Sequence, residues 1–337
     1  MQTSDSIPSH QLPPPKGFFR AGRIFKVLWQ DHDSEIHYAD PNIRYEIENP
    51  ARPRLRNMKG SASSWKKVYE IPGFLTPKHR VNALGDTAAK YNFLNEKYAV
   101  QLGFPISRDD VREVSITRHH SVTTKGMAQV PFSFDGEEDT YPLVFHLLPN
   151  CIHDVILGKA FLKATKTFSV LKNFTRRVQQ RVMDGLSQFH LLYLGESAPK
   201  FTGLLNGRPR EALADSGANG LIMDEDFAHR MGIPITSDQE HQKTVYFADN
   251  TTATTSGMTY GVRWEFGLGG VGSEHKLDFH ILKNAPADVI LSDEFLFGTN
   301  AFVEYDCYLV DDDDEDHEAE AYFYGIRIDE SHKPKSQ

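Results

Sequence analysis

The stretch ALADSGANGLIMDEDFAHRMGIPI, residues 212–235, decides the fold because the chain contains it twice. Residues 83–106 read ALGDTAAKYNFLNEKYAVQLGFPI, and nine positions are identical without a gap, including Asp86 and Asp215. Two further blocks follow in the same order, with 114–127 lying over 245–258 and 145–168 lying over 279–302. Self-similar blocks in a fixed order indicate an internal repeat. The sequence therefore predicts two copies of one domain.

The repeat also divides the chain into parts. We expect lobe 1 over residues 66–170, lobe 2 over 191–310, and a linker of helical spacing over 171–190. Residues 1–17 are rich in Ser, Pro and Gln, and residues 40–65 carry Pro, Arg, Asn, Gly and Ser. We therefore expect residues 1–65 to be an N-terminal extension, largely disordered or linker. Residues 311–337 begin with a run of acidic residues and are expected to form a solvated tail.

Each copy has the pattern of strands with a few short helices. FTGLL, Asn206-Gly207 and RPREALAD together predict a hairpin with a tight turn. The stretches DEDFAHRMG and NEKYAVQLG predict one short helix each, ended by Gly232 and Gly103. Alternating runs such as HKLDFHIL are typical of half-buried strands. The fold class expected is all-β, with two lobes in tandem.

Three stretches of the second copy resemble the retropepsin-like aspartic proteases, the family of retroviral and LTR-retrotransposon proteases. They are ALADSGA at 212–218, VYFADNTT at 245–252 and ADVILSDEFL at 287–296. In that family each of two protomers supplies one catalytic aspartate. The resemblance implies that Asp86 is the partner of Asp215, that the active unit is a monomer built as an intramolecular pseudo-dimer, and that peptide hydrolysis needs no metal or organic cofactor.

The chemistry of two adjacent carboxyl groups agrees with this. Carboxylates about 3 Å apart cannot both ionise, so they share a proton and serve as both acid and base. The neighbouring hydroxyls of Thr87 and Ser216 are expected to bridge the lobes, and Gly217 permits a close approach of the backbone. Ala88 stands where the family pattern has glycine, and with Ala218 it completes the expected support of the dyad.

The resemblance also places two flaps over the site, at 117–122 and 248–253. Flaps of this kind exclude water and hold an extended peptide or protein substrate by backbone hydrogen bonds. The candidate flap residues are Arg118, His119, Asp249 and Asn250.

Composition excludes several other classes. The net charge of −9 argues against nucleic acid as a partner. The two cysteines, Cys151 and Cys307, give no disulfide framework, and no apolar run approaches the length of a signal peptide core or a membrane helix. We therefore expect a cytoplasmic or nuclear protein that is not secreted. His119 and His120 lack a third ligand at recognisable spacing, so no metal site is expected.

The residues leave three alternatives open. The first is a catalytically inactive, peptide- or protein-binding module, favoured by Ala88 and by the unusual first flap TRHHSV. The second is a homodimer in which the two Asp215 residues of two chains form the dyad. The third is a decaying relic of a mobile element with no selected role.

Overall fold

The computed structural model describes residues 66–183, 188–195, 198–269 and 273–311, all of which lie in one compact unit. The expected N-terminal extension and the tail from residue 312 onward lie outside the described residues.

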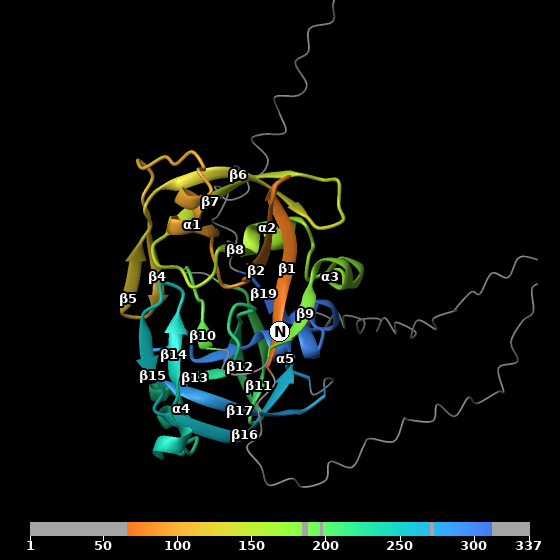
Figure 1. Ribbon diagram of the computed structural model, residues 1–337. Coiled ribbons are helices and arrows are strands. Elements are labelled where there is room, and N and C mark those ends of the chain that lie inside the picture. Colours follow the sequence, from red (N-terminus) through yellow and green to blue (C-terminus); the bar gives the residue numbers. More distant parts are fainter. Residues whose placement is uncertain (1–65, 184–187, 196–197, 270–272, 312–337) are drawn as a thin grey trace, which may run out of the picture. The chain divides into compact units, whose positions relative to one another are not determined.

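Strands of the first copy close into a barrel (Figure 1). Their order is β2-β8-β3-β7-β6-β1, and pairing of β1 with β2 closes the ring. A further strand, β9, extends the outer edge of β1. The bounds are β1 Lys66–Thr76, β2 His79–Gly85, β3 Asn92–Asn95, β6 Met127–Phe134, β7 Tyr141–Leu148, β8 Val155–Leu157 and β9 Gln179–Met183.

The second copy repeats this barrel strand for strand. Its order is β12-β18-β13-β17-β16-β11, closed by the pairing of β11 with β12 and extended by β19. The tandem repeat and the all-β fold class are thereby confirmed. The bounds are β11 Lys200–Leu205, β12 Arg208–Ala214, β13 Ile222–Asp224, β16 Gly257–Phe266, β17 His275–Leu282, β18 Val289–Leu291 and β19 Leu309–Val310.

Two hairpins project from the barrels on the same side (Figure 1). In the first copy β4 pairs with β5, and in the second β14 pairs with β15. The strand β10 precedes the second barrel and pairs in parallel with β14. The bounds are β4 Glu113–Thr117, β5 His120–Thr123, β10 Phe189–Leu191, β14 Thr244–Phe247 and β15 Thr252–Thr254.

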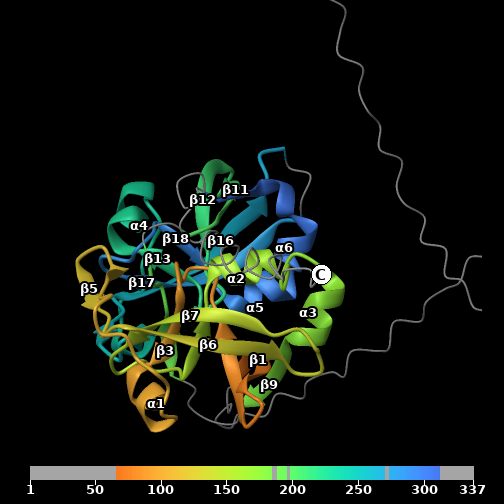
Figure 2. The ribbon, with the colours of Figure 1, turned by 90° about the horizontal axis from the view of Figure 1, so that it is seen from above.

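Short helices follow equivalent strands in the two copies (Figure 2). Asn95 and Asp224 cap the N-termini of α1 and α4, because their side chains accept hydrogen bonds from free amides of the first turn. Gly103 and Gly232, at φ 70° and 66°, follow the helix ends as the sequence predicts. The bounds are α1 Glu96–Gln101, α2 Lys159–Ala164, α3 Leu171–Arg177, α4 Glu225–Met231, α5 Asp293–Gly298, α6 Ala301–Glu304, with 3₁₀ turns at Gln239–His241 and Asp306–Tyr308.

The segment between the lobes is less helical than its spacing predicts. The helix expected over 171–190 ends at Arg177, and residues 179–183 form the strand β9 instead. These residues pair with the first half of β1, so the edge of the sheet satisfies the backbone groups that a longer helix would have satisfied internally. Tertiary pairing here overrides local helical periodicity.

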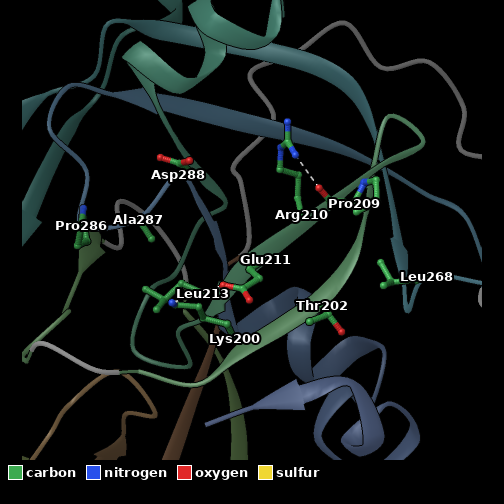
Figure 3. A pocket seen from close by; sticks show the side chains of 10 residues that line it. All are labelled: Lys200, Thr202, Pro209, Arg210, Glu211, Leu213, Leu268, Pro286, Ala287 and Asp288. Atoms are coloured by element: carbon green, nitrogen blue, oxygen red, sulfur yellow. Dashed lines mark hydrogen bonds and ion pairs between the residues drawn. The ribbon is translucent and has the colours of Figure 1, made fainter. Parts of the chain in front are cut away.

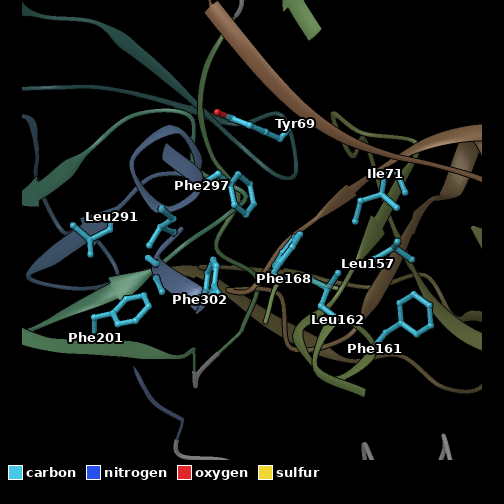
Figure 4. Close-up of a cluster of buried hydrophobic side chains, with 14 of the residues drawn as sticks. Tyr69, Ile71, Leu157, Phe161, Leu162, Phe168, Phe201, Leu291, Phe297 and Phe302 are labelled. Carbon is cyan, nitrogen blue, oxygen red and sulfur yellow. The ribbon is translucent and has the colours of Figure 1, made fainter. Parts of the chain in front are cut away.

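An aromatic cluster lies where the two lobes meet (Figure 4). Phe168 of the first lobe lies 5.0 Å from Phe297 and 5.6 Å from Phe302 of the second, measured between ring centroids. Tyr69 on β1 lies 4.8 Å from Phe297. All four side chains are buried. Buried aromatic pairs of this kind contribute about 0.5–1.5 kcal/mol each beyond their burial, so the lobes are held together by packing as well as by the linker.

Candidate active site

The two repeated aspartates stand at the same place in each barrel. Asp86 follows β2, and its amide donates to the Leu157 carbonyl on β8 at 2.9 Å. Asp215 follows β12, and its amide donates to the Leu291 carbonyl on β18 at 3.1 Å. The apolar run before each aspartate forms a buried strand, and the VIL run downstream forms its parallel neighbour. Both carboxyl groups are fully buried.

Each carboxyl group is held by one of its two oxygens. The Ala88 amide donates to Oδ1 of Asp86 at 2.7 Å, and the Gly217 amide donates to Oδ1 of Asp215 at 2.8 Å. The other oxygen, Oδ2, is buried in both residues and accepts from no N–H or hydroxyl group within the described part of the chain, which leaves the opposite carboxyl group as its partner. Buried polar atoms are normally paired, so two such oxygens mark a position for a reacting group.

Two hydroxyl groups fasten the loops across the lobe boundary. The Thr87 hydroxyl donates to the Ala214 carbonyl at 2.5 Å and accepts from the Ser216 amide at 3.0 Å. In return, the Ser216 hydroxyl donates to the Gly85 carbonyl at 2.8 Å and accepts from the Thr87 amide at 3.0 Å. Four buried hydrogen bonds therefore fix the position of one aspartate relative to the other.

Gly217 and Ala88 occupy equivalent positions but are not interchangeable. A Cβ on Gly217 would lie 2.6 Å from Cγ of Asp86, closer than real Cβ contacts come. The absence of a side chain at Gly217 thus lets the loop of the second lobe lie directly against the carboxyl of the first. The first lobe carries Ala88, whose methyl group is fully buried in the apolar cluster that surrounds the dyad. Ala218 is buried in the same cluster.

The environment raises the pKa of both acids. Burial raises the pKa of Asp86 well above its ordinary value of 3.8, and the charge of Asp215 raises it further, whereas the Ala88 amide lowers it. Burial likewise raises the pKa of Asp215, to about 7, against the opposing effect of the Gly217 and Ala218 amides. Since the carboxyl groups interact, their titration belongs to the pair and not to either residue.

The hairpins that the sequence identifies as flaps meet one another and the opposite lobe. Arg118, in the turn of the first hairpin, pairs with Asp288 at 2.9 Å and with buried Asp224 at 3.5 Å, both in the second lobe. His120 Nε2 lies 2.9 Å from Oδ2 of Asp249 in the second hairpin.

The other two flap candidates, His119 and Asn250, lie in the turns of the two hairpins and make local backbone hydrogen bonds. His119 is exposed in the first turn, and Asn250 takes a left-handed conformation, at φ 67°, in the second turn. Sequence reasoning missed Asp224 and Asp288, because nothing in the local pattern of a helix cap or a loop indicates a partner in the other lobe.

Other concave or ligating features lie away from the dyad. A pocket of about 550 Å³ lies on the second lobe between the β11–β12 hairpin and the loop at 286–288, and neither aspartate lines it (Figure 3). Among the described residues, a cluster of potential metal ligands occurs at Asp238, Glu240 and His241, two of which are exposed. Within the same residues, no helix is long and apolar enough to span a bilayer.

A family model and solved structures each match part of the chain. Residues 201–295 match the family model described as aspartyl protease, and this stretch contains Asp215. Among solved structures, the chain is similar to the retroviral protease-like domain of Ddi1 from Leishmania major, with 18% identity over 29% of this chain and 74% of that chain, at a TM-score of 0.21. No curated protein matches the chain.

Proposed function

We propose that the chain is a retropepsin-like aspartic endopeptidase, with two copies of the protease domain in tandem and a dyad formed by Asp86 and Asp215. One observation carries the proposal. Two equivalent loops of one chain bring together two buried carboxyl groups, each with an oxygen that accepts from no N–H or hydroxyl group of the described residues.

This arrangement suits acid–base hydrolysis of an amide. The pair holds one proton between its two carboxyl groups, because burial and mutual repulsion oppose a second negative charge. The ionised carboxyl takes a proton from water as the water oxygen attacks the peptide carbonyl carbon, and the protonated carboxyl donates to the carbonyl oxygen. When the C–N bond breaks, the leaving nitrogen takes a proton from one carboxyl group, and a hydroxyl of the tetrahedral intermediate returns a proton to the other, which restores the singly protonated pair. No acyl-enzyme forms.

The hydroxyl network supports this chemistry by fixing distances. Thr87 and Ser216 each bond to backbone atoms of the opposite lobe, so neither aspartate moves without the other. A displacement of about 1 Å between catalytic groups costs on the order of 10²-fold in rate. The tandem arrangement therefore favours a site within one chain over an Asp215/Asp215 site between two chains.

Cleavage of a diverse peptide library tests the proposal. Wild type, Asp86→Asn and Asp215→Asn proteins are incubated with the library from acid to neutral pH, and the products are identified by mass spectrometry. We expect cleavages in the wild type that are absent from both variants. Full activity in Asp86→Asn would refute the intramolecular dyad and favour a homodimer, which size measurement then identifies.

A second candidate function is a peptide-binding module without catalysis. Ala88 favours it, since a methyl group stands at a position where the other lobe has glycine. Folded protein that binds peptides in the groove but cleaves none at any pH would support this second function.

A further inference from the structure

A segment of the chain itself lies between the hairpins and the dyad loops. Residues 189–194, Phe-His-Leu-Leu-Tyr-Leu, run from β10 toward β11 in the stretch that joins the lobes. Phe189, His190 and Leu191 pair in parallel with Val245, Tyr246 and Phe247 of the second hairpin (Figure 1). At the other end, the Gly195 amide donates to the Ser115 carbonyl of the first hairpin at 3.1 Å. Both hairpins thus bind the segment through its backbone.

The loops that carry the aspartates bind the segment from the opposite side. The Leu194 amide donates to the Ala88 carbonyl at 3.1 Å, and the Leu194 carbonyl accepts from the Lys90 amide at 2.8 Å. Four residues earlier, the His190 carbonyl accepts from the Asn219 amide at 3.3 Å, and the His190 amide donates to Oδ1 of Asn219 at 2.9 Å. An extended peptide is therefore held at two anchors, one in each lobe.

The anchors define which peptide bond lies over the dyad. Lys90 and Asn219 are equivalent, since each stands four residues after the aspartate of its lobe. Their amides hold the carbonyls of Leu194 and His190. The carbonyl midway between these two along the chain belongs to Leu192, so the Leu192–Tyr193 bond lies at the centre of the segment between the two anchors.

The side chains of the segment fill the groove. Phe189, Leu191, Leu192, Tyr193 and Leu194 are all buried, with at most 8% of any of them exposed. They belong to the same apolar cluster as Ala88, Ala218 and the hairpin residue Val245. A connection that only spans a gap normally runs over the protein surface. This one instead removes five large apolar side chains from water and packs them in the cluster that contains Ala88 and Ala218 of the two aspartate loops.

We propose that residues 189–194 are an internal peptide ligand of the catalytic groove, and that the groove recognises extended peptides with large apolar side chains on both sides of the bond at the dyad. The preference for such peptides as substrates rests on the proposed function, whereas the binding of residues 189–194 in the groove does not. While the segment is bound, it competes with any other peptide at an effective concentration of about 1 mM. The alternative is a fixed structural tether that never leaves the groove, for which no added peptide would have a binding site.

Peptide binding to a catalytically silent protein tests the proposal. Asp215→Asn serves as the background, and the probe is a fluorescein-labelled peptide with the sequence of residues 188–195, followed by fluorescence anisotropy. In this background, Leu191→Asp with Leu194→Asp should release the segment, because two carboxylates cannot remain in an apolar groove. The control is Val182→Asp, which adds one carboxylate to an exposed position of the linker region.

We expect the released protein to bind the probe at least tenfold more tightly than the background or the Val182→Asp control. If the released variant, the background and the Val182→Asp control all bound the probe equally and tightly, residues 189–194 would not occupy the groove, and the proposal would be overturned. Absence of binding by a released protein that is shown to be folded would overturn the recognition of this peptide class and leave the fixed tether.

Hydrogen exchange provides a second measurement that needs no substitution in the segment. In the Asp215→Asn protein, the His190, Leu194 and Gly195 amides should exchange as slowly as those of the barrel strands, because each donates to a backbone or side-chain oxygen of the site. Free exchange at these amides beside protected barrels would overturn the proposal. Both probe binding and hydrogen exchange are measured in the inactive Asp215→Asn protein. A wild type without peptidase activity would therefore contradict the proposed function and leave the internal ligand untouched.

Discussion

Replacing Asp215 by asparagine should abolish cleavage and at the same time make the folded protein less sensitive to rising pH. In the wild type, burial raises the pKa of Asp215 from 3.8 to about 7. A carboxyl whose pKa is raised on folding binds more protons in the folded than in the unfolded state, so its contribution to stability is complete below about pH 4 and is lost as the pH rises to about 7. Asparagine has no such titration.

The magnitude follows from the size of the shift. Each pKa unit is worth about 1.4 kcal/mol, so a rise from 3.8 to about 7 lowers the free energy of unfolding by about 4 kcal/mol across this interval. The asparagine amide adds a buried donor, which costs about 1–3 kcal/mol at every pH. The test therefore rests on how stability changes with pH and not on its level at one pH.

Urea unfolding between about pH 4 and about pH 8 measures this change. We expect the wild type to lose about 4 kcal/mol more than Asp215→Asn over the range. The control is Asp139→Asn, which removes an exposed carboxyl between β6 and β7 and should follow the wild type. Parallel curves for Asp215→Asn and wild type would refute the argument, because they would mean that Asp215 holds no additional proton in the folded state.

Three further predictions concern the same site. Ser216→Ala leaves two buried backbone groups of the first lobe unpaired and should cost about 2–4 kcal/mol in urea unfolding, so a loss below 1 kcal/mol would contradict the cross-lobe network. Gly217→Ala places a Cβ 2.6 Å from Cγ of Asp86 and should lower kcat about 100-fold with little change in KM, and an effect on KM alone would contradict this. Protein with both carboxyl groups should cut itself at Leu192–Tyr193, giving fragments 1–192 and 193–337 by mass spectrometry that Asp215→Asn does not give; other fragment ends would contradict the register.

The sequence predicts those parts of the fold that repeat. Nine identities between two stretches identify the paired domains, and the apolar run before Asp86 and Asp215 predicts the buried strands that position them. The hydroxyls of Thr87 and Ser216 were expected to cross between the lobes, and each bonds to a backbone carbonyl of the other lobe. The assignment of roles to these residues remains a proposal.

The sequence does not predict what depends on contacts between distant segments. Residues 179–183 have helical spacing but form a strand, because they pair with the edge of β1, more than 100 residues earlier in the chain. The pairing of Arg118 with Asp224 and Asp288 joins residues more than 100 positions apart. The apolar run at 189–194 spans the expected boundary between the linker and the second lobe, and only the folded chain pairs it with the second hairpin and with the loops that follow the two aspartates.

The tandem arrangement accounts both for the sequence difference between the two aspartate loops and for the peptide segment bound between the lobes. When both halves lie on one chain, each loop evolves separately, so Ala88 faces a partner loop that needs Gly217. The chain must also pass from the end of the first barrel to the start of the second, and residues 188–195 do so between the hairpins and the aspartates. A groove that binds extended peptides through their backbone binds this connecting segment by the same hydrogen bonds. The competition between substrate and linker is therefore a direct consequence of joining the two lobes, and it makes access to the dyad depend on the release or the cleavage of residues 189–194.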